Sequence, residues 1–256
     1  MAARFSTGFR NFILMNGSAK RFLQGAVVNV YSGPQVADAD TAPAGTLLNT
    51  ITLASGAYTP EVLSAGSLTL AGTVGTVTGI TVNGVQILGA TCTFATTLTQ
   101  LAIDIAAQIN SYVSSPEYTA VASSNKVTVY ANVGTGTAPN GLALVTTGAG
   151  GITSTDVNMG TEVTGVAAAN GITWGLAASG VLSKSGVWSG VGLADGTPGW
   201  YRIARSQADM AGASTSLRRI DGAISTSSAE LNINPCISNT GVTLTIDSFS
   251  GTEPAA

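Results

Sequence analysis

The chain has 256 residues, of which 45% are hydrophobic and 9% charged, and its formal net charge is −3. A typical soluble domain carries about 25% charged residues, so this surface has little of the charge that keeps monomers apart. The hydrophobic content excludes wholesale disorder. The apolar runs are also far shorter than the about 20 residues that span a bilayer. Two interpretations stay open: a surface that associates with copies or other proteins, and a secreted monomer rich in Ser and Thr.

The N-terminal part of the chain predicts short helical and strand segments. Residues 5–14 fit either a short strand or a short helix. Ser18 and Gly25 bound a second predicted helix, as its N-cap and its C-terminal stop. The apolar run in this basic segment has only four residues, 12–15, whereas a secretory signal needs about 7–15. We therefore expect the segment to belong to the fold, with β-branched strands following at 26–31 and 46–53.

The middle of the chain, from residue 66 to residue 167, predicts a small unit of its own. Asn83-Gly84 is a strong two-residue hairpin signal between strand-like segments. A helix follows, because Leu98, Leu101, Ile105 and Ile109 are spaced by three and four residues after an N-cap at Thr96 or Thr97. Together these predict an inserted α+β unit with a β-β-α-β-β order and its own core. Its predicted strands are 67–71, 79–82, 85–88, 118–122, 126–131 and, as a further candidate, 140–146.

The last third of the chain contains all three Trp residues and a series of short strands. In 241–249, Val242, Leu244 and Ile246 alternate with polar residues, which predicts one buried face. Short strands at this spacing favour a β-sandwich. We predict a mainly β fold: an antiparallel β-sandwich-like domain that is discontinuous, residues 1–65 and 168–256, and carries the inserted unit. The predicted strands here are 171–176, 187–193, 199–204, 216–224, 229–233 and 241–249.

The absence of histidine is the most informative feature for chemistry. It excludes Ser-His-Asp and Cys-His catalysis and removes the commonest general base. Paired-carboxylate chemistry stays formally open, but the acids are scattered, and the closest pair, Asp38 and Asp40, lies in a predicted solvated turn. We expect no catalytic residue and no enzymatic activity.

No sequence pattern indicates a cofactor or a metal. The glycine-rich stretch at 134–137 lacks the Gly-Lys-Ser/Thr of a phosphate loop. Asp40, Asp156 and Asp195 lie in predicted loops where Ca²⁺ ligands occur, but no complete calcium-loop motif surrounds them. We therefore expect no cofactor and no metal.

Cys92 and Cys236 match neither a metal-binding nor a redox spacing. Two buried free thiols would suit assembly in a reducing cytoplasm. A disulfide between the two residues stays open as the alternative.

Clustered basic and aromatic residues are the candidate contact sites. Neighbouring strand residues point to opposite faces, so we expect one of Trp200 and Tyr201 to face inward and the other a partner. With Trp174 and Trp188 they form either packed core or a carbohydrate platform. Asp221-Gly222 predicts a hairpin turn, with a salt-bridged contact site as the alternative. The basic residues lack a nucleic-acid-binding motif, so we expect solvated loops or a protein contact patch. The candidate interface residues are Arg4, Arg10, Arg21, Trp200, Tyr201, Arg202, Arg218 and Arg219.

Several segments resemble proteins from the structural gene modules of tailed bacteriophages. The resemblance covers mainly the two outer parts of the chain and is one of texture, without a diagnostic motif. The middle unit, through residues 80–85 and 97–110, is similar to a small module inserted in assorted phage structural proteins. The segments that carry the outer resemblance are TGFRNFIL (7–14), 30–35, GVWSG (186–190), GTPGWYRI (196–203), 219–222 and VTLTIDSF (242–249).

This resemblance implies a virion structural protein of the tail, the neck or the capsid surface, assembled in the host cytoplasm. Its partners would be other virion proteins and copies of itself, with no small-molecule substrate, no membrane and no nucleic acid. The alternative is a host-receptor or carbohydrate-binding module on a phage fibre. The resemblance supplies no catalytic residues.

Overall fold

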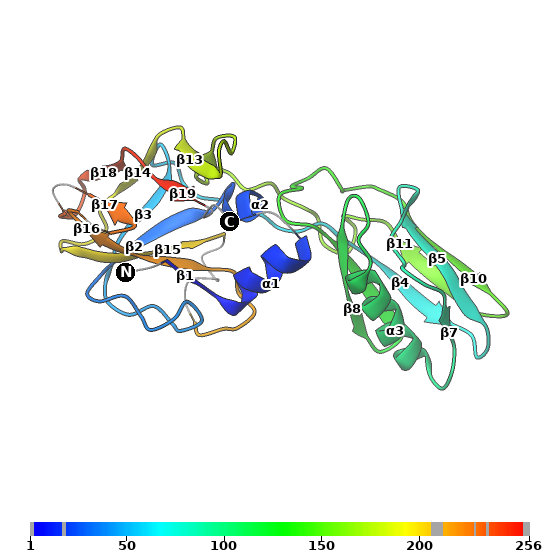
Figure 1. Ribbon diagram of the computed structural model, residues 1–256. Coiled ribbons are helices and arrows are strands. Elements are labelled where there is room, and N and C mark those ends of the chain that lie inside the picture. The colour runs from blue at the N-terminus through cyan, green and yellow to red at the C-terminus, as the bar shows by residue number, and fades with distance from the viewer. Residues whose placement is uncertain (1–2, 17–18, 206–211, 228, 234–235, 253–256) are drawn as a thin grey trace. The chain divides into compact units, whose positions relative to one another are not determined.

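A computed structural model describes residues 3–16, 19–205, 212–227, 229–233 and 236–252 of the chain (Figure 1). The fold is mainly β with antiparallel sheets, as the sequence predicts. The chain forms two compact units: an outer unit of Met1–Pro60 with Ala168–Ala256, and an inserted unit of Glu61–Ala167. The inserted unit thus begins at Glu61 instead of the expected Gly66.

The outer unit is built on an eight-stranded sheet with the order β1-β16-β15-β2-β3-β14-β18, in which β17 also pairs with β16. All neighbours are antiparallel except β16 and β17, which are parallel. The strands are β1 (Arg4–Phe5), β2 (Val27–Ser32), β3 (Leu47–Leu53), β14 (Trp188–Val191), β15 (Pro198–Ala204), β16 (Ile220–Ser225), β17 (Leu231–Asn232) and β18 (Thr243–Ile246).

A second, three-stranded sheet packs on one face of the large sheet through aromatic rings. Its strands are β12 (Thr173–Trp174), β13 (Val181–Ser185) and β19 (Ser250–Thr252). The Trp174 ring meets Trp188 of the large sheet edge-on, with 4.8 Å between centroids. Phe249, just before β19, lies 5.6 Å from Tyr201. Two sheets facing each other across an aromatic core give the sandwich-like arrangement.

Two short helices complete the outer unit. The segment for which strand and helix were both open is a helix, α1 (Thr7–Asn16). The Ser6 hydroxyl accepts the N–H of Phe9 (3.1 Å) and so caps the first turn. The second predicted helix is α2 (Ala19–Leu23), and Gly25 follows with φ +80°; the expected N-cap Ser18 lies outside the described residues. The Phe9 and Phe22 rings, 4.9 Å apart, join the two helices.

The inserted unit has two four-stranded sheets and one helix around a separate core. Thr97 caps α3 (Leu98–Ser111) by accepting the N–H of Gln100 (3.1 Å), and the predicted stripe with Leu101, Ile105 and Ile109 is buried. Asn83 and Gly84 both have positive φ, which confirms the predicted hairpin turn. The strands are β4 (Ala65–Ala71), β5 (Thr76–Val82), β6 (Val85–Gln86), β7 (Cys92–Thr93), β8 (Tyr118–Ser123), β9 (Lys126–Ala131), β10 (Leu144–Ala149) and β11 (Thr153–Val157).

The chain enters and leaves the inserted unit through neighbouring segments. Bridges join Val62 to Val166 and Ala65 to Val163, so the unit closes on itself, as insertion into another domain requires. We expect the excised fragment Glu61–Ala167 to fold alone and to unfold cooperatively in urea, measured by circular dichroism. The same fragment with Ile105→Asp, which buries an unpaired charge in this core, is the control that should not fold. A gradual, non-cooperative transition of the unaltered fragment would contradict the expectation.

Five strands and two local details differ from the predictions. The strands β1, β7, β11, β13 and β19 were not predicted, because each has at most five residues and no clear apolar alternation. In β18 only Ile246 is buried, while Val242 is 57% exposed, because β18 is the edge of its sheet. The predicted alternation is present within β18, where Leu244 is half-buried and Ile246 buried while Thr243 and Thr245 are exposed, but the predicted buried face does not extend to Val242. Across the described residues, no helix has the length and apolar character to cross a membrane.

The predicted hairpin turn at Asp221-Gly222 is wrong, because both residues lie inside β16. Asp221 is directly opposite Arg202, and Gly222 is opposite Tyr201. A Cβ on residue 222 would stand 2.3 Å from the Tyr201 hydroxyl oxygen, so glycine makes room for that ring. The pair of residues serves an ion pair and a ring contact instead of a turn.

Candidate functional site

The most strongly buried charges of the outer unit form an ion pair on its large sheet. Arg202 donates Nε–H and Nη2–H to the two carboxylate oxygens of Asp221, each at 2.7 Å, and both side chains are fully buried. Burial raises the pKa of Asp221 above its ordinary value, while the hydrogen bonds and charge of Arg202 oppose that rise. The bidentate geometry gives the carboxylate the charge-assisted bonds that compensate for its burial.

Arg202 also belongs to an arginine cluster, Arg4, Arg202 and Arg219, that holds the loop between β2 and β3. Arg202 donates to the Thr41 carbonyl (3.0 Å), and Arg219 donates to the Ala39 carbonyl (3.4 Å). Arg4 donates to the carbonyl of Val36 in the same loop. The loop carbonyls therefore receive their hydrogen bonds from guanidinium groups of three separate strands or strand ends.

The two aromatic candidates for a partner contact are both buried inside the outer unit. Trp200 stacks on Tyr31 with 4.5 Å between centroids and donates its indole N–H to the carbonyl of Ala44 in the β2–β3 loop. Tyr201 points to the other face, where Phe249 covers it. The prediction that one of these rings faces outward is wrong, because the loop covers one face of the sheet and the small sheet covers the other.

The wider aromatic group is core, so the alternative of a carbohydrate platform made by these rings is removed. Trp174, Trp188, Trp200 and Tyr201 are all buried. Burial also takes Arg202 and Arg219 out of the candidate interface, since both side chains are fully buried within the chain. Their guanidinium groups act on the protein's own loop.

Four basic candidates retain exposed area. Arg10 and Arg21 are exposed, and Arg4 and Arg218 are half-buried. The Arg218 guanidinium lies over the Phe12 ring of α1, 4.6 Å from the ring centroid. This cation–π contact covers one side of the Phe12 ring. A role for these four residues in binding a partner stays a prediction.

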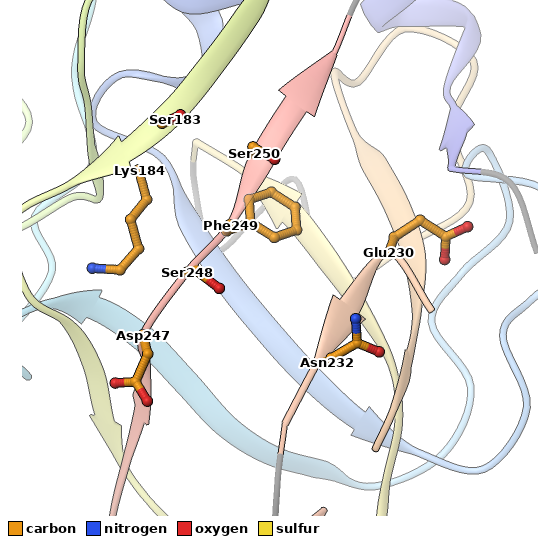
Figure 2. Close-up of a pocket in the computed structure, with 8 residues that line it drawn as sticks. All are labelled: Ser183, Lys184, Glu230, Asn232, Asp247, Ser248, Phe249 and Ser250. Carbon is orange, nitrogen blue, oxygen red and sulfur yellow. The ribbon is translucent and has the colours of Figure 1, made fainter. Parts of the chain in front are cut away.

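A polar pocket of 420 Å³ opens on the outer unit next to β19 (Figure 2). Figure 2 shows Glu230 on one side of it and Asp247 on the other, with the Phe249 ring between them. The Glu230 carboxylate accepts the N–H of Ala223 (2.8 Å), and the Lys184 ammonium donates to the carbonyl of Gly186 (2.7 Å). The lining residues are Ser183, Lys184, Glu230, Asn232, Asp247, Ser248, Phe249 and Ser250.

An apolar cavity of 610 Å³ shares Glu230, Phe249 and Ser250 with the polar pocket. Its walls come from β1, the two helices, the small sheet and the face of the large sheet. Together, the polar pocket and the apolar cavity offer carboxylates, an ammonium group, hydroxyls and an aromatic ring. These groups suit a hydroxyl-rich or amphipathic ligand. Sequence reasoning missed Glu230 and Asp247, because nothing in their local sequence marks them.

Each of the three Asp residues that the sequence offers as Ca²⁺ ligands accepts a hydrogen bond from a backbone N–H. Asp40 accepts the N–H of Thr7 (2.9 Å), Asp156 that of Thr146 (2.6 Å), and Asp195 that of Thr240 (2.6 Å). Among the residues whose placement is described, no three His, Cys, Asp or Glu side chains form a metal-binding group. The expectation that the protein binds no metal and no cofactor stays a prediction.

Cys92 and Cys236 are both free thiols, so the open alternative of a disulfide is removed. Burial raises the pKa of Cys92 to about 11 and also raises that of the half-buried Cys236. At pH 8 only roughly one part in a thousand of a thiol with that pKa is the reactive thiolate. The buried thiol, Cys92, should therefore react far more slowly than Cys236 in the folded protein.

This expectation can be tested with a disulfide reagent such as dithionitrobenzoate. We expect one thiol to react in native buffer and two in urea. The Cys236→Ser variant is the control and should lose the native reaction while keeping the reaction in urea. Fast native reaction of that variant would show that Cys92 is accessible.

A scan against protein-family models and searches of curated proteins and of solved structures found no match to this chain. The resemblance to phage structural proteins therefore stays a prediction, carried by the segments named above and by the physical properties of the surface.

Proposed function

We propose that this chain is a structural component of a bacteriophage particle, in the tail, the neck or the capsid surface. It acts by packing against copies of itself and neighbouring particle proteins. The observation that carries the proposal is a surface with few charges and many exposed apolar side chains. Only 9% of the residues are charged, while Leu14, Val113 and Leu176 are 84%, 76% and 88% exposed.

Such a surface supports association because its burial is favourable and little charge must be desolvated. Stable interfaces cover about 1,200–2,000 Å² in total. Repetition in a particle then adds avidity, because one contact raises the effective concentration for the next. Exposed apolar residues occur in both units, for example Val121 and Val145 in the inserted unit and Val187 in the outer unit.

The proposed role is non-enzymatic. The lack of histidine supports this, since it removes the commonest general acid and base. Glu230 and Asp247 do share a pocket, and paired carboxylates can hydrolyse glycosidic bonds. Hydrolysis of a glycan by the protein, lost in Glu230→Gln, would contradict the non-enzymatic role.

One observation favours the second candidate, a receptor- or carbohydrate-binding module on a fibre. The polar pocket combines carboxylate, amide and hydroxyl groups with the half-buried Phe249 ring, and such a set can hydrogen-bond sugar hydroxyls. Binding on a glycan array that is lost in Asp247→Ala, with assembly intact, would favour this candidate. The pocket would then replace Trp200 and Tyr201 as its binding surface.

The proposed function is tested on purified particles of a phage that encodes this chain. Quantitative mass spectrometry should find the chain in multiple copies per particle, and cryo-electron microscopy should locate those copies in the tail, neck or capsid surface. Particles that lack the chain would contradict the proposal.

A further inference from the structure

The strand β18 lies at one edge of the large sheet and pairs only with β14. The Gly192 N–H donates to the Val242 carbonyl and the Gly192 carbonyl accepts the N–H of Gly241 (both 2.9 Å), so the main-chain groups of Gly192 point toward the β18 side of β14. Hydrogen-bonded pairs alternate along an antiparallel ladder, so Leu244 and Ile246 also direct their main-chain groups toward β14. Thr243 and Thr245 must then direct their N–H and C=O groups away from the sheet.

Other sheet edges of this protein are covered by specific side chains. The Asn110 amide of α3 donates to the carbonyl of Ala120 in β8 and accepts its N–H (2.9 and 2.8 Å). Asp156 accepts the N–H of Thr146 in β10, where the register also shifts. Gln24 accepts the N–H of Trp174 in β12 (3.0 Å). Bulges and capped edges are ways in which proteins prevent unwanted strand pairing.

The edge at β18 carries no such device in the part of the chain that the structure describes. Residues 241–246 contain no charge and no proline, and the pairing of β18 with β14 has no register shift. The strand is also the longer of the two edges of its sheet, since β1 has only two residues. An unguarded, uncharged edge of this kind is a template for another strand.

Exposed apolar side chains lie on both faces of the sheet next to this edge. Val242, which lies opposite Gly192, is on the same face as Ile246, because alternate residues of a strand share a face. Val191, opposite Thr243, lies on the other face. Val242 is 57% exposed and Val191 is 46% exposed. Backbone pairing alone would bury little area, and apolar side chains of the edge strand add to it.

We propose that β18 pairs antiparallel with β18 of a second copy of this chain, about a two-fold axis at Leu244. This inference rests on the proposed function, because it names one surface through which copies pack. In this register, Thr243 lies opposite the partner's Thr245 in a hydrogen-bonded pair. By symmetry, Thr245 lies opposite the partner's Thr243 in a second hydrogen-bonded pair. Leu244 lies opposite the partner's Leu244 in a non-hydrogen-bonded pair, where side chains come closest.

A second copy fits this edge better than a charged partner does. An antiparallel strand pairs with itself when the same patch meets itself across a two-fold axis. The strand offers no charge for a charged partner to neutralise. In the Leu244 register, Leu244 would meet the partner's Leu244 and Val242 the partner's Ile246, which are apolar cross-strand pairs. In the Leu244 register the acidic Asp247 lies opposite the partner's Gly241, so the two carboxylates of the dimer do not face each other.

The decisive variant is Thr245→Pro in the full chain. Proline removes the outward N–H of residue 245 and leaves the ladder to β14 intact, as edge positions allow. We expect sedimentation velocity to show a dimer for the natural chain and at least a tenfold weaker association for Thr245→Pro. The matched control is Ser123→Lys, an exposed polar position on the edge strand β8, whose Ala120 main chain is covered by Asn110; it should associate like the natural chain. Circular dichroism, which reports on both units, confirms that each variant is folded.

Cysteine cross-linking tests the register. In a Cys92→Ala, Cys236→Ser background, Leu244→Cys should form a disulfide-linked dimer on mild oxidation, because facing Cβ atoms of a non-hydrogen-bonded pair lie within disulfide reach. Thr245→Cys, which faces the partner's Thr243, should cross-link far less. Equal cross-linking of both variants would overturn the Leu244 register.

The outcomes separate this inference from the proposed function. If the natural chain stays monomeric in solution, or if Thr245→Pro associates as the natural chain does, the β18 pairing is overturned. The proposed function would survive either result, provided the chain is present in multiple copies in the particle. Absence from the particle would overturn the proposed function while leaving a solution dimer through β18 as a measured fact.

Discussion

Replacing Asp221 by alanine should lower the free energy of unfolding of the outer unit by about 3–5 kcal/mol, the cost of breaking a buried ion pair from one side. The variant leaves the fully buried Arg202 guanidinium without its carboxylate. Arg219 and Arg4 are also close enough for their charges to act on Asp221, so the change would leave uncompensated positive charge. Urea unfolding followed by tryptophan fluorescence measures the loss, because all three Trp residues lie in the outer unit.

A double variant identifies the cause of this loss. Arg202→Met combined with Asp221→Leu removes both charges and should recover part of the stability, because apolar residues of similar size often replace a buried ion pair well. The recovery should be incomplete, since Arg202 also donates to the Thr41 carbonyl. Asp247→Ala, at an exposed carboxylate of the same unit, is the control and should change stability little. An Asp221→Ala variant as stable as this control would contradict the importance of the ion pair.

Elements fixed by neighbouring residues were predictable from the sequence. The stripe of α3 and the Asn83-Gly84 turn depend on side-chain spacing and on local backbone preference, and both are confirmed. The mainly β character follows from the short strands bounded by Gly, Asn and Ser. The short strands β13 and β19 carry no comparable signal, because their pairing depends on residues from distant parts of the chain.

Burial on both faces of a sheet was not predictable in this way. Strand alternation places Trp200 and Tyr201 on opposite faces, and the structure keeps that alternation. The sequence does not show that the β2–β3 loop covers the Trp200 face and the small sheet covers the Tyr201 face. For the same reason, Asp221-Gly222 resembles a turn in the sequence. Arg202, which forms the ion pair with Asp221, lies on another strand, and the local sequence does not show it.

The candidate pocket is the least predictable feature. It joins residues from β13, from β17 and the residue before it, and from the segment that leads into β19. Glu230 and Asp247 meet there only because β17 pairs with β16 while β19 pairs with β13. No spacing rule connects these segments, so the polar pocket follows from the fold and not from a motif.

Replacing Trp188 by alanine should lower the free energy of unfolding of the outer unit by about 3–5 kcal/mol, as large-to-small changes in a core do. The ring is fully buried and contacts both Trp174 and Phe249 of the small-sheet region. Its indole N–H also donates to the carbonyls of Thr173 and Ser185 (3.1 and 3.0 Å). The substitution therefore weakens the contact between the two sheets. Urea unfolding followed by circular dichroism measures the lost free energy of unfolding.

The neighbouring residue provides the matched control for this prediction. Val187→Ala alters a side chain that is 55% exposed beside the same strand and should change stability by less than about 0.5 kcal/mol. Trp188→Phe should fall between the two, because it keeps much of the ring contact while leaving two carbonyls without the indole donor. If Trp188→Ala is no less stable than Val187→Ala, the aromatic layer does not hold the small sheet on the large one. The sandwich-like core must then depend on the helices and on the loop that the arginine cluster anchors.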